Sequence, residues 1–209
     1  MKQLPGYEHR VMRRNAQERY GSAVTDALLM TSRDGVTFTR WDEAFLRPGL
    51  RDEGNWAYGD NYIAWQLIET PSHIEGAPNE LSLFASEHYW TDESNNLRRY
   101  TIRMDGFVSV NAPLSGGEIV TKPLTFNGKN LILNMAASAA GVILVEIENT
   151  DGTPIEGYAM DDCDELFGDD LDRTVSWRGN DDTGSLSDKP VRLRFRLSDA
   201  DLYSFRFLE

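Results

Sequence analysis

The feature that most constrains this chain is a two-residue alternation of apolar and polar side chains between Leu97 and Phe207. The clearest run places Val191, Leu193, Phe195 and Leu197 between Arg192, Arg194 and Arg196. A period of two puts one set of side chains on a buried sheet face and the other on a solvated face. Turn signals such as Asn127-Gly128 and Asp151-Gly152 separate the runs. The pattern predicts an all-β fold, an antiparallel, jelly-roll-like β-sandwich.

The residues before this region indicate a smaller β-rich extension. Residues 28–41 form a hairpin pattern, with a tight turn expected at Arg33-Asp34-Gly35. Residues 61–70 are expected to form a further strand. We therefore predict two domains: residues 1–75, an N-terminal arm with a hairpin segment, and residues 76–209, the sandwich. Near the C-terminus, residues 198–201 are expected to form a turn between two strands.

Composition excludes several classes of function. The chain has 209 residues and a formal net charge of −13. That charge opposes binding to nucleic acids and to anionic membranes, whereas a neutral glycan meets little penalty. Cys163 is the single cysteine, so a disulfide framework is excluded.

No segment has the ~20 apolar residues of a membrane helix. The first residues also lack the apolar core of a signal peptide. An extracellular or periplasmic location would therefore require an export signal further upstream.

Two segments carry a family resemblance. Ser32-Arg33-Asp34-Gly35 with Phe38 and Trp41 resembles the Ser-x-Asp-Gly-x-x-Phe hairpin of glycosidase-type β-propeller blades. The longer segment runs through Leu97–Phe107, Gly117–Leu124, Gly141–Glu148, Val175–Trp177 and Ala200–Phe205. Together they resemble the C-terminal β-sandwich of bacterial proteins related to glycoside hydrolase families 32 and 43, in which a five-bladed propeller precedes a jelly-roll-like sandwich.

The resemblance implies a carbohydrate-associated role and also shows where this chain departs from the family. Five blades of four strands require several times the ~45 residues that precede the sandwich. In that family the catalytic carboxylates lie at the propeller centre, mostly on blades that have no counterpart here. The chain thus resembles a last blade, or part of one, followed by the whole sandwich.

Glycoside hydrolysis requires two carboxyl groups, about 5 to 9.5 Å apart depending on the mechanism. The carboxylates nearest the blade-like part are Asp42, Glu43, Asp52, Glu53 and Asp60. Nothing in their spacing brings a pair together, so solvated loop charges are the alternative interpretation. The catalytic residues are left unassigned.

Sugar binding needs flat aromatic faces together with groups that bond to hydroxyls. The predicted ligand-binding residues supply that mixture between positions 51 and 65: Arg51, Asp52, Trp56, Tyr58, Asp60 and Trp65. Nearby Arg47 and Asn55 add donors. The alternative is that Trp56, Tyr62 and Trp65 are core residues that pack the blade onto the sandwich.

The acidic stretch at residues 161–172 suggests a structural calcium ion, the one cofactor considered for this chain. Its spacing fails the EF-hand pattern, and a solvated acidic loop is the simpler interpretation. The three histidines show no zinc spacing.

We therefore expect a non-catalytic or catalytically incomplete module that binds a glycan or supports a propeller domain. One alternative is a glycoside hydrolase whose carboxylate site is assembled by oligomerisation. Another is a structural module for self-association, because an orphan blade leaves strand edges and an apolar face uncovered.

Overall fold

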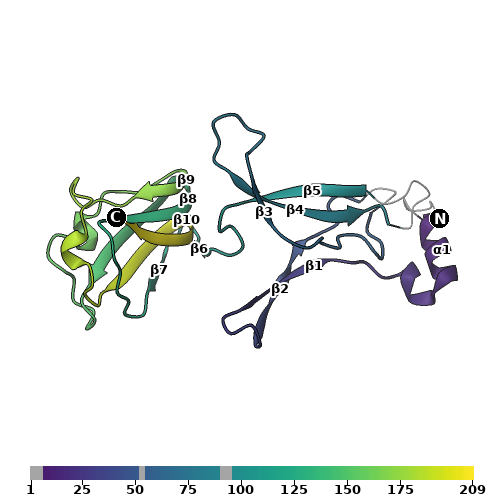
Figure 1. Ribbon diagram of the computed structural model, residues 1–209, viewed down its shortest axis with the longest axis horizontal. Helices are drawn as coiled ribbons and strands as arrows, with labels where there is room; N and C mark the ends of the chain where they lie inside the picture. Colours follow the sequence, from purple (N-terminus) through teal and green to yellow (C-terminus); the bar gives the residue numbers. More distant parts are fainter. Residues whose placement is uncertain (1–6, 52–54, 90–95) are drawn as a thin grey trace. The chain divides into compact units, whose positions relative to one another are not determined.

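The computed structural model describes residues 7–51, 55–89 and 96–209, and most of its regular structure is antiparallel β-strand (Figure 1). One α-helix, α1 (Tyr7–Ala16), and three short 3-10 turns, η1 (Glu18–Gly21), η2 (Met160–Asp162) and η3 (Gly184–Leu186), complete it. The predicted all-β, sandwich-like fold class is confirmed. Within the described residues, no helix has the length and apolarity needed to cross a membrane.

The chain divides into two compact units, Met1–Ile102 (unit 1) and Arg103–Glu209 (unit 2). The sequence analysis placed the boundary at 75/76. The difference arises because β4 (Glu80–Glu87) and β5 (Asn96–Arg103) belong to the same sheet as β3 (Ile68–Thr70), in the order β3-β4-β5. Each unit is described separately below.

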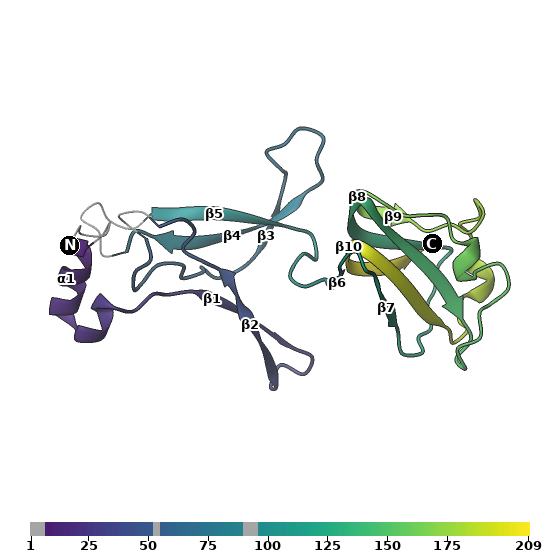
Figure 2. The ribbon, with the colours of Figure 1, turned by 180° about the vertical axis from the view of Figure 1, so that it is seen from behind.

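Two long strands form the framework of unit 2. β8 (Asn130–Glu148) pairs antiparallel with β10 (Arg192–Leu208) along their whole length. β9 (Asp169–Thr174) pairs with the other edge of β8, while β6 (Val110–Ala112) and β7 (Gly117–Val120) both pair with β10. The sheet curls around the core as a single five-stranded layer (Figure 2).

The prediction of a turn at residues 198–201 is wrong. β10 continues through this segment with a shift in register between Ser198 and Ala200, and Asp199 has a left-handed backbone with φ 43°. On β8 the register moves from Val142 to Ala137 at the same place. A bulge of this kind bends a strand without ending it, so two predicted strands form one.

The alternating apolar residues of β8 and β10 form the centre of the unit 2 core. Fully or almost fully buried side chains include Leu131, Leu133, Met135, Ile143, Val145, Ile147, Leu193, Phe195 and Leu197. Trp177 closes this core: its ring meets Tyr158 edge-on at 5.1 Å, and its indole N–H donates to the Val145 carbonyl at 2.9 Å. The period-two pattern therefore identified the buried face correctly.

Unit 1 contains two separate small sheets. β1 (Ala27–Ser32) and β2 (Phe38–Leu46) form a two-stranded sheet, and β3, β4 and β5 form the other. At the tip of the β1–β2 hairpin, the Asp34 carboxylate accepts the backbone N–H groups of Val36 and Thr37 at 2.9 and 2.7 Å. Both bonds lower the pKa of Asp34, and the bond from Thr37 has the larger effect.

The strand expected at residues 61–70 is mostly wrong. Only Ile68–Thr70 forms a strand, and Ile63 makes an isolated bridge to Ala85. Asn61 and Gln66 have left-handed backbones, with φ of 62° and 79°. A residue in that conformation interrupts the extended ladder of a strand, so the chain becomes an irregular loop.

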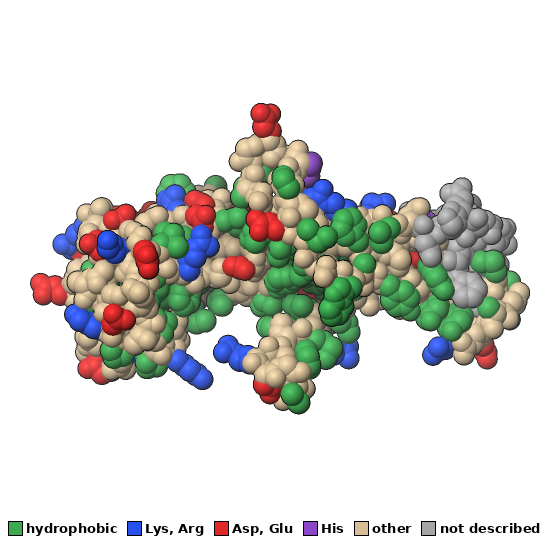
Figure 3. Space-filling view, viewed as in Figure 1, with side chains coloured by type: hydrophobic (Ala, Val, Ile, Leu, Met, Phe, Trp, Pro, Cys, Tyr) green, Lys and Arg blue, Asp and Glu red, His purple; other side chains and the backbone are tan. Residues whose placement is uncertain are grey.

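Unit 1 buries little apolar surface. Among its described residues, the buried apolar side chains are those of Ala57, Leu83 and Ala85. Many larger apolar side chains are exposed, among them Leu28, Met30, Val36, Phe38, Trp41, Leu50, Trp56, Tyr62, Trp65, Leu67, Ile74 and Leu97. Hydrophobic side chains accordingly reach the surface over this unit on the face in Figure 3.

Candidate functional site

A polar cavity of about 350 Å³ lies within unit 1. Its volume falls in the range typical of small-ligand sites. The lining combines two carboxylates, two guanidinium groups, an imidazole, a phenol and two amides: Asp60, Glu87, Arg47, Arg98, His88, Tyr100, Asn55 and Asn61, together with Pro48, Gly49 and Leu50.

Asp60 and Glu87 form the acidic part of this cavity. Asp60 is 2% exposed, and its Oδ1 accepts the Tyr89 backbone N–H at 2.9 Å. Glu87 lies at the end of β4 and accepts the Tyr100 hydroxyl at Oε1 and the Arg98 Nε–H at Oε2, the latter at 2.6 Å. Both oxygens of Glu87 are therefore engaged by side chains of β5.

Burial is the main reason that the pKa of Tyr100 rises to about 12, followed by its hydrogen bond to Glu87 and the charge of that carboxylate. The Asp60 charge adds a smaller effect in the same direction. The two carboxylates thus act on the same phenol, and Tyr100 stays protonated as a donor at neutral pH.

The loop that carries Asp60 is held in place by backbone geometry. Gly59 has φ 98°, and a Cβ atom there would lie 2.1 Å from the Tyr89 ring, so only glycine fits. The next turn is fixed by Asn61, whose side-chain amide donates to the Thr25 carbonyl at 2.9 Å. Asp60 is therefore positioned by the folded loop and not by a strand.

The other side of the cavity comes from the segment after β2. Asn55 Nδ2 donates to the Pro48 carbonyl at 2.9 Å and also to the Leu50 carbonyl. The Trp56 indole N–H donates to the Gly49 carbonyl at 2.8 Å. These bonds close the loop beside Arg47, an exposed side chain that makes no hydrogen bond or ion pair with the described residues.

The structure disperses most of the predicted ligand-binding residues. Asp60 lines the cavity, and Trp56, with 39% of its surface exposed, adjoins it through Gly49. Arg51 is exposed outside the lining, and Asp52 lies outside the described residues. The remaining two predictions, Tyr58 and Trp65, form no part of the cavity lining.

Tyr58 stacks on Tyr20, with 4.1 Å between ring centroids. Hydrogen bonding with Tyr62 and then with Tyr20 raises the pKa of Tyr58 to about 12. Trp65 is 91% exposed and Tyr62 is 51% exposed. Neither side chain is therefore part of the core within unit 1.

Sequence reasoning missed Glu87, Arg98 and Tyr100. It treated residues after 76 as sandwich strands, so the ends of β4 and β5 were not considered together with the loop at Asp60. The sequence does hold a signal for them: Glu87 ends one alternating run, and Arg98 and Tyr100 lie two residues apart in the next. Pairing across a hairpin brings such positions together.

Two of the other carboxylates considered for catalysis, Asp42 and Glu43, do not line this cavity. Both are exposed on β2, while Glu53, like Asp52, lies outside the described residues. The cavity instead combines Asp60 with Glu87, whose two oxygens are occupied. Glu87 would have to break these hydrogen bonds to act as a base or nucleophile.

A second hollow, of about 450 Å³, lies at the β1–β2 hairpin and is lined by Thr31, Ser32, Arg33, Asp34, Thr37 and Thr39. Its carboxylate already organises the hairpin turn through the bonds described above. The cavity around Asp60 and Glu87 is therefore the stronger candidate for a ligand site.

The acidic stretch at residues 161–172 is used in structural contacts. Asp164 accepts the Ser176 hydroxyl at 2.5 Å and the Gly179 backbone N–H at 2.8 Å, and Asp162 pairs with Arg178. Across the described residues, no group of three or more His, Cys, Asp or Glu side chains is arranged to hold a metal ion.

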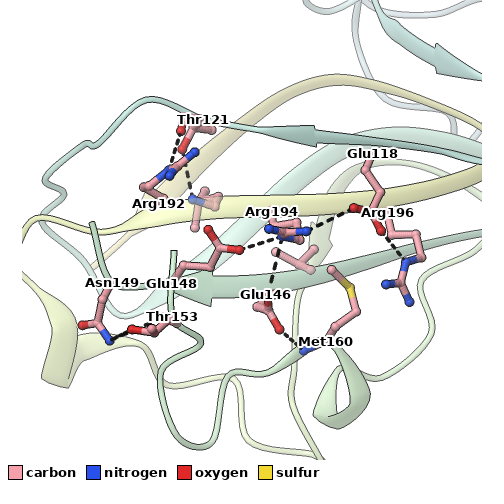
Figure 4. Close-up of polar contacts among 12 residues, drawn as sticks. Glu118, Thr121, Glu146, Glu148, Asn149, Thr153, Met160, Arg192, Arg194 and Arg196 are labelled. Atoms are coloured by element: carbon pink, nitrogen blue, oxygen red, sulfur yellow. Dashed lines mark hydrogen bonds and ion pairs between the residues drawn. The ribbon is translucent and has the colours of Figure 1, made fainter. Parts of the chain in front are cut away.

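A second polar cluster lies on the outer face of β8 and β10 in unit 2 (Figure 4). The Arg194 Nε lies 2.6 Å from Glu148 and 3.7 Å from Glu146. Glu146 also accepts the Met160 backbone N–H at 2.8 Å, so the segment after β8 covers both acids. The arginine ladder thus pairs with nearby acids, as we expect of facing charges on neighbouring strands, but one of these acids, Glu148, is only 1% exposed.

No protein-family model matches the chain, and neither a curated protein nor a solved structure matches it.

Proposed function

We propose that this chain is a carbohydrate-associated module that binds a glycan in the cavity around Asp60 and Glu87. The observation that carries the proposal is the convergence of two carboxylates with arginine and tyrosine donors around one hollow of ligand size. The resemblance of residues 28–207 to accessory sandwiches of glycoside hydrolases supports the same class of ligand.

The chemistry of the lining suits a sugar. Carboxylates accept hydrogen bonds from sugar hydroxyls, and guanidinium groups donate to hydroxyl and ring oxygens. Trp56 exposes part of its ring beside the cavity, which offers an apolar surface to a pyranose. Hydrogen bonds within the lining already hold Asn55, Asn61 and Glu87 in place, which lowers the entropy lost when a ligand binds.

Glycan-array screening of the purified chain, followed by calorimetry with the best saccharide, tests the proposal. Asp60→Asn should weaken binding about 10-fold or more, because it removes one charged acceptor. Asp42→Asn, an exposed site on β2 outside the lining, is the matched control and should bind normally. Absence of binding to any saccharide would refute the proposal.

The same preparations distinguish a binding module from a hydrolase. We expect no turnover of aryl glycosides or polysaccharides, because both oxygens of Glu87 are held by Tyr100 and Arg98. Turnover that disappears in both Asp60→Asn and Glu87→Gln, with the fold intact, would establish the hydrolase alternative instead.

A self-association module is the second candidate, and the exposed apolar side chains of β1 and β2 favour it. Met30 and Phe38 are 53% and 52% exposed, and Trp41 is 39% exposed. A two-stranded sheet is marginally stable alone in water. A second copy that covers these side chains would stabilise the hairpin.

Sedimentation velocity measures this directly. The chain should form dimers at micromolar concentration, and Met30→Lys should dissociate them, because a buried lysine at the interface is costly. Leu114→Lys, at a 66% exposed position of unit 2, is the control. A monomer at all concentrations would exclude this second function.

A further inference from the structure

The hydrogen-bonding groups of the unit 1 cavity are unevenly used. Its acceptors at Glu87 are both occupied, by the Tyr100 hydroxyl and the Arg98 Nε–H. The amide of Asn55 donates to two backbone carbonyls, and that of Asn61 donates to Thr25. These groups hold the cavity together and have little left to offer a ligand.

The guanidinium groups are different. Arg47 makes no hydrogen bond or ion pair with the described residues, and Arg98 uses only its Nε–H within that part of the chain. A guanidinium group has five N–H donors and no acceptor. The hydrogen-bond donors that the lining can still offer to a ligand are therefore mainly cationic. An anionic acceptor on the ligand matches such donors best.

The carboxylate of Asp60 sets a second requirement. It lies near the Tyr100 phenol, together with Glu87, so one wall of the cavity is acidic. A small anion such as phosphate would bring its negative charge close to that wall, where the carboxylates repel it. A ligand with one carboxylate and several hydroxyl groups complements both walls.

From this distribution we propose that the cavity selects saccharides that carry a carboxylate, with Arg47 paired to the ligand carboxylate and the uncharged part of the sugar facing the acidic wall. This inference rests on the proposed glycan-binding function and names its ligand class. Of the formal net charge of −13, unit 1 carries −4 and unit 2 carries −9, so most of the negative charge lies outside the unit that contains the cavity. The negative charge of the chain therefore repels a ligand carboxylate less strongly near Arg47 than the total charge suggests.

Calorimetry with chemically matched saccharides tests the proposal on the whole chain. The probes are oligogalacturonate, a hyaluronan oligosaccharide and sialyllactose, each compared with its methyl ester, which keeps the sugar and linkage and removes the charge. Neutral glycans from the array serve as the reference for the general binding function. We expect at least one acid to bind about 10-fold more tightly than its ester.

Arg47→Gln should abolish that difference and weaken the acid about 10-fold, because Arg47 is exposed and its ion pair is partly screened. Arg40→Gln, an exposed arginine of β2 outside the lining, is the matched control and should keep the preference. Thermal unfolding of both variants should match the parent chain, since neither arginine has a structural partner among the described residues.

Two results would overturn the inference while leaving glycan binding intact: acids and esters that bind equally, or an acid preference that survives in Arg47→Gln. If only neutral glycans bind, the inference also fails. If no saccharide of either kind binds, both the inference and the proposed function fail.

Discussion

The buried ion pair between Arg194 and Glu148 allows a sharp test of how unit 2 is stabilised. The Glu148 side chain is 1% exposed and that of Arg194 is 35% exposed, with 2.6 Å between Oε1 and Nε. Arg194→Gln leaves Glu148 inside the protein without its cation. Removal of one partner from a buried pair costs about 3–5 kcal/mol.

Partial exposure of Arg194 moves the expected cost to the lower end, about 3 kcal/mol in the free energy of unfolding. Arg196→Gln is the matched control on the same strand. Arg196 pairs with Glu118, and their side chains are 51% and 40% exposed. Removal of an exposed pair costs about 1 kcal/mol or less.

Cys163 provides a local assay for unit 2. It is the single cysteine of the chain, and its Sγ accepts the Val145 backbone N–H at 3.2 Å. Pulsed alkylation across a urea gradient therefore reports the opening of this unit alone. With an m-value of about 1.5 kcal/mol/M, Arg194→Gln should lower the urea midpoint by about 2 M.

A double substitution tests the same account of the buried pair. The cost in Arg194→Gln arises from a Glu148 carboxylate that stays buried without its cation, so it should disappear when that carboxylate is removed as well. Arg194→Met with Glu148→Leu should be nearly as stable as the parent chain. An Arg194→Gln midpoint equal to that of Arg196→Gln would refute the account of a buried pair.

Three further predictions follow from local geometry. Gly141→Ala should destabilise unit 2 by about 2 kcal/mol in the same urea assay, because a Cβ there would lie 2.3 Å from the Asp199 carbonyl oxygen. The folded chain should lose stability between pH 10 and 12, because Tyr100 ionises at a lower pH in the unfolded chain than in the folded one. Tyr100→Phe also removes the bond to Glu87, and it should lose less stability over that range in denaturant titrations. Burial raises the pKa of Cys163 to about 11, so native alkylation at pH 8 should be about 100-fold slower than that of free cysteine; equal rates would contradict this burial.

The core of unit 2 was predictable to a large extent because burial in a strand follows a local rule. Leu193, Phe195 and Leu197 are inside, as their alternation with arginines indicates. The same rule could not show that residues 198–201 form a bulge, because Asp-containing segments are common in both turns and bulges. It also left Glu148 on a solvated face, since the segment that covers it, around Met160, is distant in sequence.

The candidate site was predicted only in part, for a related reason. Asp60 and its glycine-containing loop were visible as a cluster of aromatic and polar residues, but their neighbours in sequence, Tyr58 and Trp65, point to other surroundings. Left-handed backbone at Asn61 and Gln66 redirects the chain between them. Such a change of direction has no signature in residue type alone.

The amino-acid order alone determined that this protein is built from antiparallel strands and which side chains of β8 and β10 face inward, because a strand places successive residues on opposite faces. Only the tertiary structure decided that Asp60, Glu87, Arg98 and Tyr100 share a cavity and that Glu148 is enclosed. These outcomes depend on which distant segments pack together, and packing is set by the sum of many weak contacts rather than by any local pattern.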